Sequence, residues 1–382
     1  EEDVHTAIER RLTELCGPVG GKVHTGRSRN DQCVTALRLW SRRELRAIAT
    51  ELLSLCDTLG DRAREAGWGA DAVYLPGYTH VQRAQPVLLA HHFLAHGWAF
   101  MRDVERIAQT IRRMDVSTLG AGALAGSSLP LQPDSVAEDL GFASTFTNSL
   151  DAVSDRDFVA EALFDLALIG THLSRLGEEW VLWTTEEFGF ATLSDGYSTG
   201  SSMLPQKKNA DIAELARGKA GRLLGNLAGF LATLKGLPLA YNRDLQEDKE
   251  PLFDSVDQTR RAIVALRGMI ASATIRPDRM RAAADAELLA ATDIAEWLVG
   301  EGMPFREAHA VVGGLVQRVI AGEGSLHDLV TQHAQLGQRA AAVISRGVRN
   351  RTSPGGAGPE PVARQYEQYC AQMSTLRNLT DL

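Results

Sequence analysis

The sequence predicts an all-α fold, a long central helical bundle with small helical domains at its ends. Proline, which interrupts helices, is absent from five long stretches, namely residues 19–75, 87–129, 134–204, 206–237 and 252–276. Most of these stretches are rich in Leu, Ala, Arg and Glu, which favour helix. The alternation of polar and apolar residues that is typical of half-buried strands is nearly absent, so a sheet-based fold is not expected.

Apolar residues recur at helical spacing within these stretches. One series consists of Leu37, Leu39, Leu45, Ile48, Leu52, Leu53 and Leu55. Another consists of Phe158, Ala162, Leu163, Leu166, Leu168, Ile169, Leu173 and Leu176. Helices of about 25 residues or more exceed the usual globular length and predict a long bundle. Because their apolar faces are broad, we expect other subunits to cover part of the bundle.

The distribution of long helical stretches and of Gly and Pro residues divides the chain into three expected domains. Residues 28–282 contain the long helical stretches and are assigned to the central bundle. Residues 283–382 contain shorter helical pieces broken by Gly and Pro, and are assigned to a small C-terminal helical domain. The sequence opens at Glu1 without Met, within a polar and helix-like segment. We therefore interpret residues 1–27 as the remnant of an N-terminal helical domain.

Composition indicates a cytoplasmic globular protein. The 382 residues are 44% hydrophobic and 23% charged, which is ordinary for a soluble domain. The net charge of -8 argues against a nucleic-acid surface, which needs a basic face. No apolar run reaches the roughly 18 residues of a membrane span, and no signal peptide opens the sequence. The four cysteines lack paired spacing, so we expect them to be reduced.

The segment 199–217 is the most informative for function. It opens as a loop of small residues with two hydroxyls, Ser201 and Ser202, and we predict that a helix begins after Pro205. The predicted helix start carries Lys207 and Lys208, and both the backbone N–H groups there and the ammonium groups attract anions. Such a loop is suited to hold a carboxylate beside a small oxygen base, as elimination through a carbanion requires.

Three further segments place many polar groups between apolar helices. Residues 24–32 combine two guanidinium groups with a hydroxyl and an amide, which suits carboxylate binding, although a helix cap explains them equally well. Residues 77–86 form a loop in the prediction and contain His80, a candidate for proton transfer, although a single loop histidine is more often structural or merely exposed. Residues 240–250 are a dense polar run, and such runs are usually solvated turns.

Other patterns are set aside. Residues 120–126 have the glycine spacing of a dinucleotide loop, but they follow a helical stretch and not a strand, so a tight connection is expected. His92 and His96 have metal-ligand spacing, yet no acidic residue or cysteine nearby completes a site, so no metal is expected. Ser201 with Lys207 is also compatible with a Ser–Lys hydrolase, which leaves the other polar loops unexplained.

Taken together, these segments resemble the argininosuccinate lyase family of the fumarase/aspartase superfamily. The superfamily loop Gly-Ser-Ser-x-x-Pro-x-Lys-x-Asn is present at 200–209, and Pro-Gln-Lys-Lys-Asn within it is the form typical of this family. Further similar segments are 2–12, 24–32, 77–82, 151–158 and 241–249. Typical members have an additional N-terminal segment before the part that corresponds to residue 1, and it carries a serine that contacts the substrate. Ala210 stands where the family usually has Pro.

The resemblance implies an all-helical homotetramer in which loops of three different subunits assemble each active site. Segments 24–32, 77–86 and 199–214 would meet in trans. It also implies cleavage of argininosuccinate to arginine and fumarate, in arginine biosynthesis, without a metal or organic cofactor. Two alternatives stay open. They are another fumarate-releasing lyase of the superfamily, and a non-catalytic member resembling structural lens proteins.

The resemblance also implies roles for individual residues. Ser201 would be the base that removes a proton next to a succinyl carboxylate, and Lys207 and Asn209 would stabilise the resulting aci-carboxylate. His80, held by Glu214, would assist proton transfer near the leaving guanidinium. The residues implied for the succinyl half of the substrate are Ser28, Arg29, Asn30 and Thr79. Those implied for the amino-acid half are Tyr241, Gln246 and Lys249.

Overall fold

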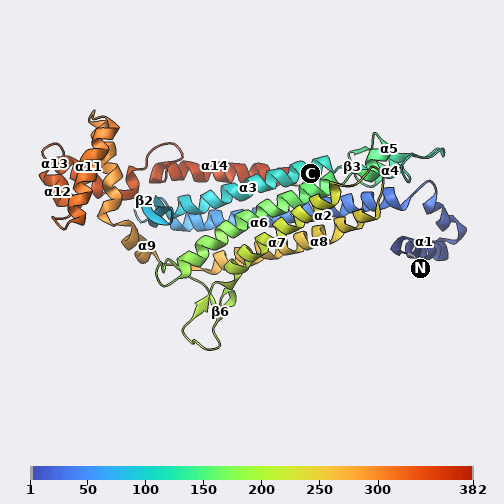
Figure 1. The fold of residues 1–382 in the computed structure, drawn as a ribbon, viewed down its shortest axis with the longest axis horizontal. Coiled ribbons are helices and arrows are strands. Elements are labelled where there is room, and N and C mark those ends of the chain that lie inside the picture. The colour runs from blue at the N-terminus through green and yellow to red at the C-terminus, as the bar shows by residue number, and fades with distance from the viewer. Residues whose placement is uncertain (1–2, 381–382) are drawn as a thin grey trace.

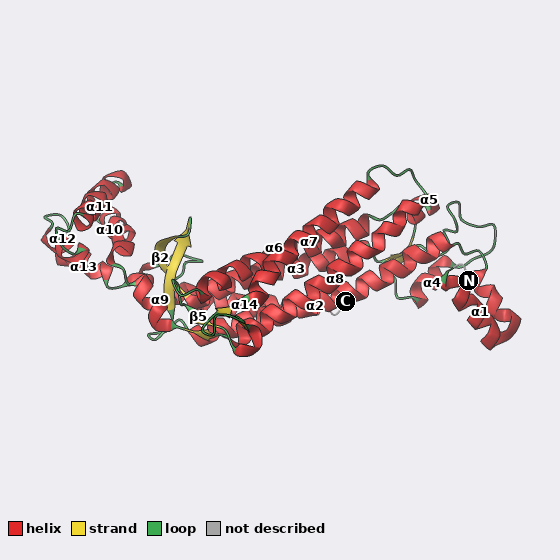
Figure 2. Ribbon diagram, turned by 60° about the horizontal axis from the view of Figure 1, so that its bottom comes forward, coloured by secondary structure: helices red, strands yellow, loops and turns green. Residues whose placement is uncertain are grey.

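Long helices lying side by side form the body of the molecule (Figure 1). The computed structural model describes residues 3–380. The long helices are α2 (Arg29–Ala66), α3 (Leu89–Arg113), α6 (Asp157–Thr184), α7 (Asp211–Leu234), α8 (Lys249–Ser272) and α14 (Pro359–Thr380). The strands within the described residues are short and lie in two-stranded sheets (Figure 2). The predicted all-α class and long central bundle are confirmed.

One end of the bundle, shown on the right of Figure 1, carries the chain's first elements and the connections between α3 and α6. These elements are α1 (Val4–Cys16), the 3-10 helix η1 (Gly17–His24), β3 (Val116–Ser117), α4 (Pro133–Asp139), β4 (Ser144–Thr145) and α5 (Ser149–Ser154). The 3-10 helix η3 (Arg243–Asp248), which precedes α8, contacts both α7 and α8.

The opposite end carries the remaining elements (Figures 1 and 2). Those next to the bundle are β1 (Tyr74–Thr79), β2 (Gln82–Leu88), β5 (Ala191–Thr192), η2 (Asp195–Tyr197), β6 (Thr199–Gly200), β7 (Lys208–Asn209), β8 (Thr274–Ile275) and α9 (Pro277–Ala284). Beyond them lie η4 (Glu287–Ala290), α10 (Ala291–Gly300), α11 (Phe305–Ile320), α12 (Leu326–Gln332), α13 (Gly337–Ile344) and η5 (Gly347–Asn350).

The bundle encloses one continuous apolar core, to which α2, α3, α6, α7, α8 and α14 all contribute. Its largest fully buried side chains include Phe93, Phe100 and Trp180. Helix α6 approaches α7 closely at Gly177, where a Cβ atom would lie 2.6 Å from the backbone oxygen of Ala213. This close contact fixes the position of the first turns of α7. Within the described residues, no helix is long and apolar enough to cross a membrane.

A second apolar cluster, separate from the bundle core, is formed by α10, α11, α12 and α13. Helix α14, in contrast, returns along α3 and α2. Residues 283–382 therefore include a separate helical cluster and one helix of the bundle. The boundaries at 27/28 and 282/283 stay predictions. All four cysteines lie among the described residues and are free.

A buried carboxyl group between α3 and α6 predicts a stability that depends on pH. The side chain of Asp165 accepts a hydrogen bond from Thr110 Oγ1 (2.7 Å), and burial raises its pKa to about 6. An unfolded chain releases this proton at lower pH than the folded chain does. The carboxyl therefore causes a loss of folding stability as pH rises through about 4 to 6, and the penalty is complete above that range.

We expect Asp165→Asn to stabilise the protein by about 1–3 kcal/mol at pH 8 and by no more than about 0.5 kcal/mol at pH 4. The measurement is the melting temperature at both pH values and at one fixed protein concentration. Asp103→Asn is the matched control, because Asp103 is equally buried but bonds Arg106 Nη1 (2.8 Å) and His172 Nδ1 (2.6 Å). This control should destabilise the protein. Equal effects of both replacements would contradict the prediction.

Candidate active site

His80 lies at the tip of a β-hairpin formed by β1 and β2. The two turn residues, His80 and Val81, both have positive φ angles, 54° and 58°. Two-residue hairpin turns of type I′ have this backbone, which Asn and Gly adopt easily and a β-branched residue such as Val rarely does. The predicted loop at 77–86 is therefore wrong, because its Gly and Pro residues are contained within paired strands. Thr79 pairs with Gln82 directly below the turn, and the side chains of Thr79 and His80 are exposed.

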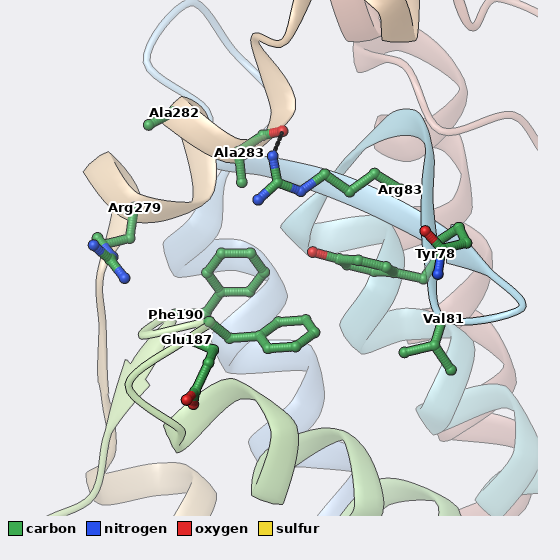
Figure 3. Close-up of a pocket in the computed structure, with 10 residues that line it drawn as sticks. Tyr78, Val81, Arg83, Glu187, Phe190, Arg279, Ala282 and Ala283 are labelled. Atoms are coloured by element: carbon green, nitrogen blue, oxygen red, sulfur yellow. Dashed lines mark hydrogen bonds between the residues drawn. The ribbon is translucent and has the colours of Figure 1, made fainter.

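A cavity of 710 Å³ lies beside this hairpin (Figure 3). Tyr78, Arg83 and Glu187 line it, together with Arg279 on α9. Both guanidinium groups already bond to backbone oxygens, Arg83 to Ala283 (3.4 Å) and Arg279 to Glu186 (3.1 Å). They fasten α9 to the hairpin and to the end of α6. The cavity wall thus supports the turn that carries His80.

Ser201 lies in a loop that projects from the same end of the bundle, next to β6 in Figure 1. Its Oγ accepts hydrogen bonds from the backbone N–H groups of Met203 (3.2 Å) and Leu204 (3.0 Å). Two N–H dipoles aimed at one hydroxyl oxygen stabilise negative charge on that oxygen. The backbone of this loop therefore favours the ionised form of the Ser201 hydroxyl.

The predicted helix start after Pro205 is wrong, because α7 begins at Asp211. Pro205 lies in a turn in which the Lys207 N–H donates to the Leu204 oxygen (3.1 Å). Strand β7 then pairs with β6 and delays the helix. Lys207 consequently lies outside α7, four residues before its first residue.

The two lysines of the loop differ in their partners. Lys208 forms an ion pair with Asp195 and lowers the pKa of that carboxyl group. Lys207 is exposed and has no ion pair among residues 3–380. Its ammonium group is therefore available to a ligand. Asn209, two residues further along in β7, is half-buried.

Glu214 lies in the first turn of α7 and is exposed. No hydrogen bond or ion pair of the described chain joins Glu214 to His80, or either residue to Ser201. These three residues thus share one end of the bundle without forming a site within a single chain. The predicted contact between His80 and Glu214 stays a prediction.

The segment 24–32 lies at the opposite end, at the start of α2. Ser28 caps α2, with its Oγ accepting from the Asn30 N–H (3.2 Å), so the helix-cap interpretation of this residue is confirmed. The Arg29 guanidinium binds Asp3 (3.0 Å) and Thr6 (3.1 Å) at the start of α1. The Asn30 amide donates to the backbone oxygen of Ala123 (3.0 Å).

The segment 240–250 lies at that same end, between α7 and α8. The side chain of Gln246 donates to the hydroxyl of Tyr241. Lys249, the first residue of α8, binds Asp248 (2.6 Å), and the buried Asp248 also binds Arg156 Nε (2.6 Å). This ion triad fixes the position of the ammonium group of Lys249 at the start of a helix, where anions are favoured.

Asp31 is a residue that the sequence analysis overlooked. Its fully buried carboxylate accepts from the backbone N–H groups of Ser28 (3.0 Å), Gly120 (3.0 Å) and Gly122 (2.9 Å), and burial raises its pKa. The glycine loop at 120–126 follows the short strand β3, so the expectation that no strand precedes it is wrong. The anion that this loop binds is a side chain of the same chain.

The predicted site residues thus form two groups at opposite ends of the bundle. One group is Thr79, His80, Ser201, Lys207, Asn209 and Glu214, and the other is Ser28, Arg29, Asn30, Tyr241, Gln246 and Lys249. Helix α8 begins at Lys249 and ends at Ser272, whose Oγ lies 2.9 Å from that of Ser194, shortly before the Ser201 loop. With 24 residues in α8, the two groups are about 36 Å apart.

Comparison with known proteins gives matches over nearly the whole chain. A family model described as a lyase matches residues 1–225, and one described as the argininosuccinate lyase C-terminal region matches residues 288–351. An argininosuccinate lyase from Mycobacteroides abscessus is 51% identical over 99% of this chain and 80% of that protein. One from Frankia casuarinae is 54% identical over 96% of this chain and 79% of that protein.

Solved structures share the fold. An EDDS lyase in complex with formate is 27% identical, with a TM-score of 0.88 over 98% of this chain and 77% of that chain. A class II fumarase from Schistosoma mansoni is 16% identical, with a TM-score of 0.74 over 84% of this chain and 70% of that chain. These similarities confirm the expected fumarase/aspartase-like fold.

Proposed function

We propose that this chain cleaves argininosuccinate to arginine and fumarate, because it belongs to the argininosuccinate lyase family. The reaction is a β-elimination through an aci-carboxylate carbanion and needs no metal or organic cofactor. We place it in arginine biosynthesis, in the cytoplasm. Within the structure, the observation that carries this proposal is the Ser201 hydroxyl with two backbone N–H groups aimed at its oxygen.

The proposed reaction begins when Ser201 removes the proton next to a succinyl carboxylate. A serine hydroxyl is a weak base unless its ionised form is stabilised. The N–H groups of Met203 and Leu204 stabilise that form, and Lys207, whose ammonium has no ion pair within the described part of the chain, lies in the same loop. The backbone of the loop therefore supplies part of the stabilisation that Ser201 needs in order to act as a base.

Proton removal gives the substrate carboxylate a second negative charge. Lys207 and Asn209 are proposed to stabilise this dianion. Only the stabilisation that increases as the second charge develops in the transition state accelerates the reaction. Elimination then expels the guanidinium nitrogen. His80, positioned by Glu214 of another subunit, is proposed to assist proton transfer to that nitrogen.

Substrate binding is assigned to polar groups from both ends of the bundle. Ser28, Arg29, Asn30 and Thr79 are proposed to bind the succinyl half. Tyr241, Gln246 and Lys249 are proposed to bind the amino-acid half. The ion triad around Asp248 supports the second assignment, because it holds the Lys249 ammonium in a fixed position for the substrate carboxylate.

A homotetramer with shared active sites is proposed to bring the two groups together. Helix α7 exposes Leu215, Leu224 and Leu231, with 60%, 50% and 48% of their surface accessible. On the same helix, an added Cβ at Gly218, Gly221, Gly225 or Gly229 would meet no heavy atom of the described chain within 4 Å apart from the neighbouring backbone of α7 itself. Such an open face of apolar and small residues on a long helix suits close packing against helices of other copies.

The proposed activity is tested by incubating the purified chain with argininosuccinate and measuring both arginine and the ultraviolet absorbance of fumarate. We expect equal amounts of the two products. A parallel assay with adenylosuccinate and with malate distinguishes this reaction from those of other superfamily lyases. Absence of turnover on all three substrates would leave the chain as a non-catalytic member of the family.

A further inference from the structure

The groove between α3 and α6 holds a cluster of side chains that the proposed reaction does not use. His92 and His96 lie one turn apart on α3, and Glu179 faces them from α6. The Nε2 atoms of His92 and His96 lie 2.7 Å and 2.6 Å from the same oxygen, Oε2 of Glu179. The expectation that no acidic residue accompanies these histidines is therefore wrong. Packing of α3 on α6 supplies one from a distant part of the sequence.

We propose that His92, His96 and Glu179 form a binding site for one divalent transition-metal ion, of the class of Zn²⁺, Co²⁺ and Ni²⁺. Two imidazole nitrogens and one carboxylate oxygen are a donor set that these ions prefer. Ca²⁺ and Mg²⁺ prefer ligands that are all oxygen, so the site should discriminate against them.

The distances between the donor atoms fit such an ion after a small adjustment. The three ligand atoms all lie within 4.8 Å of one another. In a tetrahedral zinc site with bonds of about 2.0–2.2 Å, neighbouring donor atoms are about 3.3 Å apart. The carboxylate oxygen must therefore move from each imidazole by about 0.7 Å. Glu179, whose side chain is 37% exposed, has room for this movement.

Access to the cluster is provided by a cavity of 570 Å³. The small side chains of Ala95 and Ala99 line it and leave space for a further ligand of the ion. Arg102 and Arg175 lie at its exposed rim, and their charge favours an anionic ligand there, such as hydroxide. This charged rim contrasts with the apolar exposed face of α7, so the groove is expected to stay open when subunits associate.

The cavity also places the ion near the hairpin that carries His80. Tyr78, in β1, and Val81, in the hairpin turn, line the same cavity as the histidines. The bound ion would join α3 to α6 in a cavity that the hairpin also lines. Metal binding is therefore expected to stabilise this end of the bundle, whether or not the chain cleaves argininosuccinate.

The test uses the full chain after removal of metal by a chelator. Titration with Co²⁺ should give the visible absorption of a low-coordinate nitrogen and oxygen site, saturate at one ion per chain and be reversed by Zn²⁺. Glu179→Gln and His96→Asn should weaken Co²⁺ binding at least about a hundredfold, since each removes a direct ligand. Zn²⁺ should raise the melting temperature of the unmodified chain but not that of Glu179→Gln.

Residues adjacent in sequence to the proposed ligands provide matched controls: His91 lines the same cavity, and Glu178 faces α7 instead. His91→Asn removes an imidazole that bonds Gln365 (2.9 Å), and Glu178→Gln removes a carboxylate that bonds Arg217. Both should bind Co²⁺ as the unmodified chain does. If His96→Asn fails to fold, His92→Gln tests the more exposed histidine ligand. Absence of stoichiometric binding, unchanged affinity in Glu179→Gln, or equal loss in His91→Asn would overturn the proposal.

Discussion

Replacing Ser201 with alanine is expected to lower kcat by about a thousandfold or more, which corresponds to about 4 kcal/mol of transition-state stabilisation. The replacement removes the oxygen that the N–H groups of Met203 and Leu204 surround. No other hydroxyl in the loop has two such donors among the described residues. The measurement is fumarate absorbance at saturating argininosuccinate, together with KM, which should change little.

Ser202→Ala is the matched control for this experiment. Ser202 is the adjacent hydroxyl in the same exposed loop, and its replacement should leave kcat within about tenfold of the original value. The subunit assembly of both variants is compared by light scattering. Near-normal turnover in Ser201→Ala, or an equal loss in Ser202→Ala, would contradict the assignment of the base.

Mixing two inactive variants is expected to restore activity. Lys249 begins α8, and the Ser201 loop lies near the other end of this helix, about 36 Å away. One chain therefore cannot place both residues at one substrate. If Ser201→Ala and Lys249→Met chains are mixed in equal amounts, dissociated and reassembled, some sites receive Ser201 from one chain and Lys249 from another. With random assembly, about one quarter of the sites are intact, and about one quarter of the normal activity should return.

This experiment separates shared sites from sites within single chains. A site built within one chain would never contain both intact residues in the mixture, and no activity would return. The necessary control mixes Ser201→Ala with Lys207→Met. Their positions lie in the same loop and belong to one chain at any site, so this mixture should stay inactive.

Periodicity predicted the bundle well because long apolar faces are a property of local sequence. The start of α7 was predicted wrongly, since Pro205 is compatible with both a helix start and a turn. The pairing of β6 with β7 decided between the two. The hairpin was missed because His80 and Val81 are not typical turn residues, and the antiparallel pairing of the strands holds them at positive φ.

The polar clusters show the same difference between contacts within a short stretch of sequence and contacts that depend on tertiary packing. The cap at Ser28 is local and was one of the two interpretations of that segment, whereas the glycine loop around Asp31 joins residues about ninety positions apart. Glu179 reaches the two histidines of α3 only because α6 packs on α3. Local spacing contains no information about such partners. The assembly of a site across subunits is likewise a property of surfaces.

The path of α14 has a mechanical consequence for the cluster formed by α10, α11, α12 and α13. Because the chain leaves the bundle after α9 and rejoins it as α14, two covalent tethers hold this cluster. The cluster cannot rotate freely about a single hinge, because both connections to the bundle must deform together. A protease cut at either crossing would leave the cluster attached through the other.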